Sequence, residues 1–262
     1  MSLTITSLNS GSNGNCYYIG NDTDAVLVDV GISARGTQRR MQRLGLAPEK
    51  LKAIFVSHEH GDHITGIVGL SRKFRIPVYI SAGTHEAAKL PIDEGFCFHF
   101  AHNDCIEAGS LQVLAFQKLH DAADPYSFTI TDGLVKVGVF TDIGRVCSNL
   151  IKHFKDCHAA FLEANYCEQL LENGSYPFYL KKRISGGRGH LSNTQALDLF
   201  VKHRHAQLSH LVLSHLSKNN NDPELVSRLF SAQRKSTLIT IASRYHEMPI
   251  LTVRANRQMA LF

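Results

Sequence analysis

The sequence predicts an α/β protein in which two β-sheets pack face to face and helices cover their outer faces. Short apolar runs bounded by Gly, Asn or Asp recur along the chain, as expected for strands buried in a sandwich. Segments with helical character lie between several of these runs. Because no repeat, low-complexity stretch or break in composition marks a linker, we expect residues 1–262 to form a single domain.

The expected strands are short and mostly apolar. They lie at 3–8, 17–20, 25–28, 52–56, 78–80, 111–118, 126–131, 134–140, 159–162, 211–213 and 237–241. Asp132 and Gly133 separate two of these strands. Since both residue types tolerate positive φ, they predict a two-residue hairpin turn.

The expected helices lie at 35–44, 63–74, 84–90, 193–203 and 223–230. Ser192 and Gln195 have the spacing of a capping box, in which each side chain bonds the other residue's backbone N–H. This pair predicts that a helix begins directly after Ser192.

The composition is that of an ordinary globular protein, with 44% hydrophobic and 19% charged residues. No basic flank followed by an apolar stretch opens the chain, and no apolar run approaches the roughly 20 residues of a membrane span. Six cysteines are scattered without a C-x-x-C pair, which argues against a thiolate zinc knuckle or a disulfide framework. We therefore expect a cytoplasmic protein with no membrane partner.

The most informative segment holds four metal-binding residue types within six positions: His58, His60, Asp62 and His63. His58 and His60 alternate, so both can point toward one ion from an extended loop. The adjacent Asp62 and His63 can then reach a second ion just beyond the first. This cluster predicts a metal site.

Further candidate ligands lie two residues after the ends of expected strands. His58 follows 52–56, His120 follows 111–118, Asp142 follows 134–140, and His215 follows 211–213. Open sheets usually hold ligands at the carboxyl ends of their strands, so we expect these side chains to converge. A lone histidine, such as His99 or His210, is instead interpreted as an ordinary structural residue.

The donor set narrows the choice of metal. Imidazole and carboxylate without thiolate suit Zn²⁺, Mn²⁺ or Fe²⁺. Asp142 can bridge two ions, because one carboxylate can give an oxygen to each. Two ions about 3.5–4 Å apart would share a hydroxide and stabilise the attacking and leaving oxygens together.

The run from His58 to His63 resembles the H-x-H-x-D-H signature of the metallo-β-lactamase fold. The segment at 28–31 resembles the preceding strand of that family and its aspartate, here Asp29. This resemblance implies a four-layer α/β/β/α sandwich with the site at the edge of the two sheets. It also implies one ion held by His58, His60, His120 and Asp142, and a second held by Asp62, His63, Asp142 and His215.

A closer resemblance rests on motifs distributed along nearly the whole chain. The segments at 10–15, 120–125, 163–165, 189–193 and 214–217 are similar to those of the YycJ/WalJ-type proteins, bacterial enzymes of this fold that are regarded as DNA exonucleases. The motifs around His190 and His215 also resemble those of ribonuclease Z, which cuts RNA phosphodiesters. The long substrate-clamping insertion of that ribonuclease is missing from this sequence.

Individual roles follow from side-chain chemistry. His190, outside the seven ligands, can contact a phosphate oxygen or protonate the leaving alkoxide, and we assign it with Asp62 to catalysis. Asp29 and Glu163 are expected to fix imidazole tautomers from behind the ligands. A solvent-facing acid at a strand end is nearly as good an interpretation of Glu163.

Four residues are candidates for binding the substrate. The loop at 10–15, with Ser12 and Asn15, could offer N–H groups to a phosphate, although such a loop is more often a simple turn. Lys182 and Arg183 belong to a basic cluster beside His190 that could contact phosphates. A solvated helix face is the ordinary interpretation of such a cluster.

These observations predict a two-metal hydrolase of nucleic-acid phosphodiesters whose substrate is DNA degraded from an end. The fold also hosts hydrolases of small esters, thioesters, lactones and phosphoesters, so a small-molecule substrate is the main alternative. A metal-dependent scaffolding module without catalysis is a third hypothesis. The presence of every ligand disfavours it.

Overall fold

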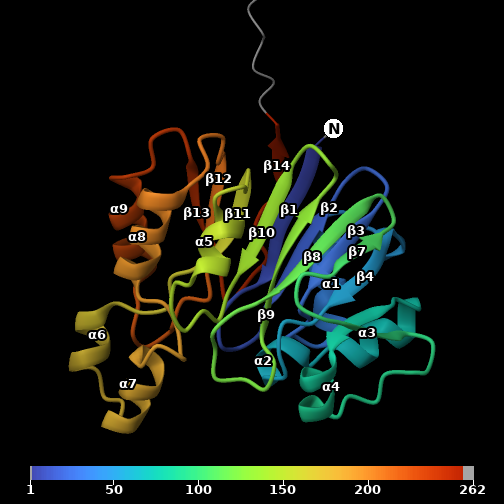
Figure 1. Ribbon diagram of the computed structural model, residues 1–262, viewed down its shortest axis with the longest axis horizontal. Helices are drawn as coiled ribbons and strands as arrows, with labels where there is room; N and C mark the ends of the chain where they lie inside the picture. The colour runs from blue at the N-terminus through green and yellow to red at the C-terminus, as the bar shows by residue number, and fades with distance from the viewer. Residues whose placement is uncertain (1, 256–262) are drawn as a thin grey trace, which may run out of the picture.

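Two seven-stranded sheets form the centre of the computed structural model, which describes residues 2–255 (Figure 1). In spatial order, the first sheet consists of β14 (Leu251–Arg254), β1 (Ser2–Asn9), β2 (Cys16–Gly20), β3 (Ala25–Val28), β4 (Leu51–Phe55), β5 (Val78–Ser81) and β6 (Cys97–Phe100). The second consists of β13 (Leu238–Ile241), β12 (His210–Ser214), β11 (Ala159–Glu163), β10 (Lys136–Phe140), β9 (Tyr126–Thr131), β8 (Leu111–Gln117) and β7 (Cys105–Ala108).

The strand directions bring the important loops to one end of the molecule. In the first sheet β3, β4, β5 and β6 run parallel. In the second, β10, β11, β12 and β13 run parallel, and β8 shares their direction because β9 is antiparallel to both β8 and β10. The loops that follow β4, β10 and β11 therefore emerge together, at the lower end in Figure 1.

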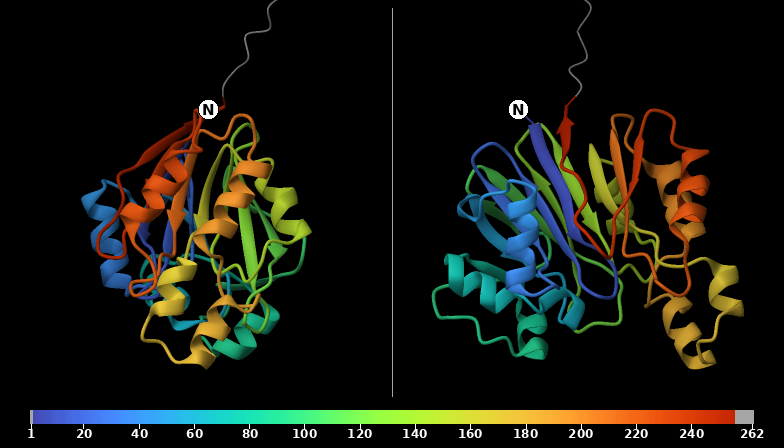
Figure 2. Two further views of the ribbon diagram at one scale, coloured as in Figure 1. Left: turned by 90° about the vertical axis from the view of Figure 1, so that its left-hand side faces the viewer. Right: turned by 180° about the vertical axis from the view of Figure 1, so that it is seen from behind.

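Helices complete the outer layers. The first sheet is covered by α1 (Ala34–Arg43) and α3 (Ile67–Phe74), and the second by α5 (Ser148–Phe154), α8 (Asn193–His203) and α9 (Pro223–Ser231) (Figure 2). Below the sheets lie α2 (Gly61–Ile64), α4 (Ala82–Ala88), α6 (Glu168–Asn173) and α7 (Phe178–Ser185). A 3₁₀ turn, η1, covers Pro48–Lys50. Within residues 2–255, no helix is long and apolar enough to span a membrane.

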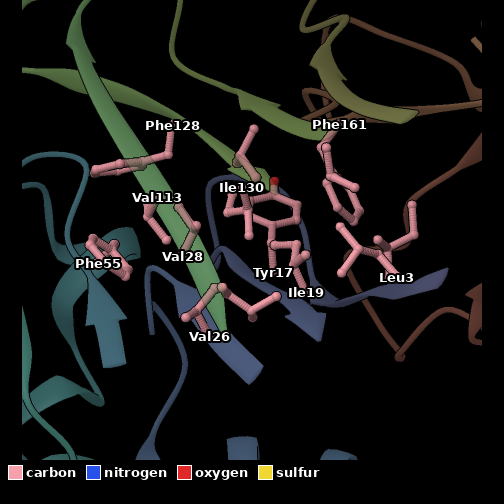
Figure 3. Packing of buried hydrophobic residues seen from close by; sticks show 14 of the residues in the cluster. Leu3, Tyr17, Ile19, Val26, Val28, Phe55, Val113, Phe128, Ile130 and Phe161 are labelled. Carbon is pink, nitrogen blue, oxygen red and sulfur yellow. The ribbon is translucent and has the colours of Figure 1, made fainter. Parts of the chain in front are cut away.

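Three apolar clusters hold the layers together. The central cluster fills the space between the sheets, where Tyr17 and Phe55 of the first sheet face Phe128 and Phe161 of the second (Figure 3). A second cluster packs α5, α8 and α9 on the second sheet, and a third packs α1 and α3 on the first. The predicted four-layer α/β/β/α sandwich is confirmed.

Most predicted elements are present, and the capping box of Ser192 and Gln195 is confirmed at the start of α8. The predicted helix 63–74 is wrong in one respect, because α2 and α3 are separate. Gly66 lies between them, where an added Cβ would be 2.2 Å from the Ile32 carbonyl oxygen, so the chain bends around that loop. Strands β6, β7 and β14 and helices α5, α6 and α7 were not predicted.

The predicted two-residue turn at Asp132 and Gly133 is also wrong in length. The strands pair Thr131 with Lys136, so four residues form the connection. The Asp132 side chain accepts hydrogen bonds from the backbone N–H groups of Leu134 and Val135, and these bonds stabilise the longer loop.

The central cluster makes a testable prediction about stability. Phe128→Ala should lower the free energy of unfolding by about 3–5 kcal/mol, because it leaves a cavity between the sheets. Phe178→Ala, at a side chain that is 79% exposed, should change it by less than about 0.5 kcal/mol. Urea denaturation of both variants measures the difference. Equal losses of stability would contradict this account of the core.

Candidate metal centre

All seven predicted ligands lie at the lower end of the sheets. His58 and His60 follow β4, Asp62 and His63 lie in α2, His120 follows β8, Asp142 follows β10, and His215 follows β12. The convergence predicted from the strand ends is therefore present in the structure. It brings together residues up to 157 positions apart in the sequence, from His58 to His215.

One group of possible ligand atoms consists of three imidazoles. The ligand atoms of His58, His60 and His120 lie within 4.8 Å of one another. His58 Nε2 is 3.1 Å from His60 Nδ1, and the rings of His58 and His120 meet edge to face with centroids 4.8 Å apart. Three ligand atoms this close together could hold one metal ion.

A second group contains Asp62, His63 and His215, whose ligand atoms also lie within 4.8 Å of one another. Asp62 Oδ2 is 3.6 Å from Nε2 of both histidines. Asp142 lies between the two groups, with Oδ2 3.1 Å from His63 Nε2 and Oδ1 3.8 Å from His120 Nε2. Its position suits a carboxylate that bridges two ions, and the assignment of each ligand to an ion stays a prediction.

In four of the histidines, Nδ1 forms a hydrogen bond with a group outside the set of ligands. The partners are Ser57 Oγ for His58 at 2.9 Å, Asp29 Oδ2 for His63 at 2.7 Å, the Gly189 carbonyl for His120 at 2.9 Å, and Glu163 Oε1 for His215 at 2.9 Å. Each partner can accept the Nδ1 proton, so in the neutral ring the lone pair is on Nε2, the nitrogen nearer the other ligands. This is the tautomer that a metal ligand needs.

Glu163 organises the second sheet's side of the centre. Oε1 accepts hydrogen bonds from His190 Nδ1 and His215 Nδ1, and Oε2 accepts them from the backbone N–H groups of Ile143 and Leu191. The residue is completely buried, so the alternative of a solvent-facing acid is wrong. Glu163 instead orients two imidazoles, and it also holds the backbone next to Asp142 and next to His190.

Three residues of the centre adopt the left-handed backbone conformation within two residues of the end of a strand. Their φ angles are 60° for Asp29, 54° for Asp142 and 56° for His215. This region is unfavourable for residues other than glycine, and it persists where surrounding contacts hold it. The His215 carbonyl accepts a hydrogen bond from Asn165, and Lys118 Nζ donates to the Thr141 carbonyl beside Asp142.

The histidines fall into two electrostatic classes. Burial lowers the pKa of His58 well below its usual value and that of His120 to about 4. Burial also opposes the charged form of His63, but attraction to Asp142 and Asp29 outweighs it and raises its pKa to about 10. The carboxylates of Asp142 and Asp29 therefore stabilise the protonated form of His63.

The carboxylates remain ionised near neutral pH. Burial would raise the pKa of Asp62, but the nearby His63 charge lowers it to about 2. Burial likewise opposes ionisation of Glu163, and His190 lowers its pKa to about 2. For Asp142, interaction with the charged histidines overcomes burial and holds the pKa well below the usual range.

The centre passes a structural test for a bound cation. Three buried atoms of the centre have no hydrogen-bond partner among residues 2–255: His120 Nε2, His215 Nε2 and Asp142 Oδ2. Asp142 Oδ2 lies near His63 Nε2, but not in hydrogen-bonding geometry. Unpartnered buried polar atoms are costly, and divalent ions with nitrogen and oxygen ligands would satisfy all three.

The predicted substrate-binding residues differ in their surroundings. Ser12 and Arg183 line the cavity over the centre, and Arg183 pairs with Asp121. Lys182 is exposed on α7 and does not line the cavity. Asn15 is completely buried, and its amide donates to Asp62 Oδ2, so we correct its predicted role from substrate contact to positioning of Asp62.

Sequence reasoning missed three groups that support the centre. Ser57 orients His58, the Gly189 carbonyl orients His120, and Lys118 is buried beside Asp142 with its ammonium on the Thr141 carbonyl. Ser57 and Lys118 lie next to predicted ligands, which is a weak signal. A backbone carbonyl such as that of Gly189 has no signal in a sequence, because every residue carries one.

Comparison with known proteins identifies the family. Residues 10–126 match the Metallo-beta-lactamase superfamily. Exodeoxyribonuclease YycJ of Bacillus anthracis is 34% identical, over 86% of this chain and 86% of its own. The chain belongs to the YycJ/WalJ family of the metallo-beta-lactamase superfamily. It is accordingly a metal-dependent hydrolase, and the fold implies binding of divalent metal.

Other relatives agree with this assignment. Exodeoxyribonuclease WalJ of Streptococcus pneumoniae is 30% identical, over 83% of each chain. The crystal structure of the metallo-beta-lactamase fold protein YhfI from Bacillus subtilis superposes with a TM-score of 0.72 at 18% identity. That match covers 94% of this chain and 99% of the other, and it shows the shared fold.

The hydrogen bonds of Glu163 predict the effect of a conservative change. Glu163→Gln replaces one acceptor oxygen with a donor, so no orientation of the amide can accept from two imidazoles and two backbone N–H groups. The affinity for Zn²⁺ or Mn²⁺ should fall by about 10–100-fold. Competition with a chromophoric chelator measures this affinity.

The matched control is Glu172→Gln, at an exposed position of α6. This variant should bind metal as tightly as the unmodified protein. If Glu163→Gln retained full affinity while folded, Glu163 would not orient the ligands.

Proposed function

We propose that this hydrolase cleaves phosphodiester bonds of nucleic acid, with DNA degraded from an end as its substrate. Two divalent ions, Zn²⁺ or Mn²⁺ and with Fe²⁺ also compatible, would occupy the candidate metal centre. The observation that carries the proposal is that the hollow over the centre adjoins a further hollow on each of two sides. The exodeoxyribonuclease names of the YycJ and WalJ relatives support it.

A row of three hollows passes over the centre. The middle hollow, about 250 Å³, is lined by His190, His120 and Ser217. It shares His120 with a hollow of about 440 Å³ that includes Arg188, and Ser217 with one of about 300 Å³ that includes Arg244. A small ester would need only the middle hollow, whereas a chain of nucleotides can follow the whole row and place phosphates near the flanking arginines.

Helix α7 adds features suited to a single strand. Phe178 and Tyr179 are 79% and 73% exposed, and Lys181 and Lys182 follow them. Exposed aromatic rings stack on bases and cations pair with phosphates, and both contacts tolerate any sequence. The same helix contributes Arg183 to the middle hollow, so strand binding and the centre are adjacent.

The residues of the chain have separate roles in the proposed reaction. His190 Nδ1 is held by Glu163, which leaves Nε2 free to contact a phosphate oxygen or to protonate the leaving alkoxide. Asp62, whose side chain is 23% exposed and is positioned by Asn15, would orient the attacking water as well as bind metal. The two ions would supply an activated water and stabilise the charge on the attacking and leaving oxygens.

We also propose a cytoplasmic location. All six cysteines are free thiols in the structure, and Cys16 and Cys157 lie within the packed core. Persistent free thiols are typical of a reducing compartment.

The central carboxylate provides the main test of this function. Asp142→Ala should reduce Mn²⁺-dependent cleavage of labelled DNA to background, because it removes the ligand between the two groups. Asp198→Ala, at an exposed site on α8, should retain full activity. The assay uses single- and double-stranded substrates, with RNA of the same sequence in parallel.

Two results would overturn the proposal. One is the absence of metal-dependent DNA cleavage by protein shown to contain both ions. The other is turnover of a small ester, thioester or phosphoester without any nuclease activity, which would establish the small-molecule alternative.

Helix α7 predicts a separable effect on substrate binding. Lys182→Ala should raise KM several-fold, leave kcat unchanged and reduce the slope of log KM against log salt by about 1, since one phosphate contact is lost. Lys155→Ala, at the exposed end of α5, should change none of these quantities. A lower kcat with unchanged KM would place Lys182 outside the binding surface.

A further inference from the structure

A second group of metal-binding side chains lies outside the candidate metal centre. His85 is on α4, and Cys97 and His99 are on β6, the edge strand of the first sheet. Their ligand atoms all lie within 4.8 Å of one another. We call these three residues the edge cluster.

The fold explains why these residues meet. Side chains alternate along a strand, so Cys97 and His99 share one face of β6. Cys97 packs against the outer apolar cluster of the first sheet, and this contact places the shared face on the helix side. Helix α4 follows the neighbouring strand β5 and brings His85 to the same face.

A hydrogen bond fixes the ring of His85 in the form that a metal ligand requires. Nε2 lies 3.2 Å from the Leu90 carbonyl oxygen, which can only accept, so Nε2 carries the proton. In the neutral ring Nδ1 then holds a lone pair, and it lies beside Cys97 Sγ and His99 Nε2. Such an acceptor behind the ring is the usual companion of a metal-bound histidine.

The distances within the edge cluster fit the edges of a zinc tetrahedron. Zn–N bonds of about 2.0–2.1 Å and Zn–S bonds of about 2.3 Å require roughly 3.3 Å between two nitrogens and roughly 3.6 Å between nitrogen and sulfur. The structure has 3.2 Å between His85 Nδ1 and His99 Nε2, and 3.7 Å between His85 Nδ1 and Cys97 Sγ. Two edges thus match those of a zinc tetrahedron, and the third pair, Cys97 Sγ and His99 Nε2, lies within 4.8 Å.

We propose that His85, Cys97 and His99 form a further Zn²⁺ site at the sheet edge, with three protein ligands. Its fourth position is open to water, because His99 is exposed. The ion would fasten α4 to β6. Helix α4 in turn holds the segment after His120, because the Ser81 and Thr84 hydroxyl groups both donate to the Asp124 carbonyl.

Cobalt substitution tests this site independently of catalysis. Co²⁺ replaces Zn²⁺ in tetrahedral sites, and Co²⁺ bound to a thiolate has a strong charge-transfer band in the near ultraviolet. The ligands of the candidate metal centre contain no sulfur, so such a band can arise only from a cysteine site. Titration of the full chain with Co²⁺, under a reductant that is not a thiol, should produce the band, and Zn²⁺ should remove it.

Three variants locate the signal. Cys97→Ser should abolish the band, whereas Cys105→Ser, at an exposed cysteine of β7, should retain it. His99→Ala changes an exposed side chain that the fold does not need, and it should weaken Co²⁺ binding at this site by more than about tenfold. No band at saturating Co²⁺, or a band that survives in Cys97→Ser, would overturn the proposal. If the full chain shows the band but cleaves no DNA, the proposed nuclease function is contradicted and the edge-cluster site is not.

Discussion

The Glu163 carboxylate, at the end of β11, is the constraint on which the second sheet's side of the centre depends. Burying a carboxylate costs several kcal/mol unless its oxygens are fully hydrogen-bonded, and here four donors surround it. Two of the donors are the imidazoles of His190 and His215, and two are backbone amides next to Asp142 and His190. One buried charge therefore sets the position of a proposed acid, of a ligand and of the carboxylate between the metal groups.

Asp29 is the counterpart in the first sheet. Its carboxylate binds His63 Nδ1 and both the N–H and the hydroxyl of Ser57, which in turn contacts His58. The two halves are joined by Ser10, whose hydroxyl accepts a hydrogen bond from the His215 amide. Each sheet thus contributes its own buried anion and its own ligands. The ligands of the two sheets therefore come together only when the sheets pack face to face as they do here.

Much of this arrangement could be predicted because it is encoded locally. Ligands that directly follow apolar strands are visible in a sequence, and the parallel strands then bring them to one edge. What could not be predicted depends on contacts between distant segments. Helix α7 has no buried residue and hence no apolar stripe to reveal it. The burial of Asn15, the carbonyl of Gly189 behind His120, and the meeting of His85 with Cys97 follow only from the packed chain.

The central claim is that these side chains enclose two ions, and anomalous diffraction from crystals grown with Mn²⁺ or Zn²⁺ tests it most directly. The account predicts two peaks about 3.5–4 Å apart at this site, one beside His58 and His120 and one beside His63 and His215, with Asp142 between them. A site without any peak, or an experimental structure in which His120 or His215 turns its Nε2 away from the imidazoles of His58, His60 and His63, would contradict it.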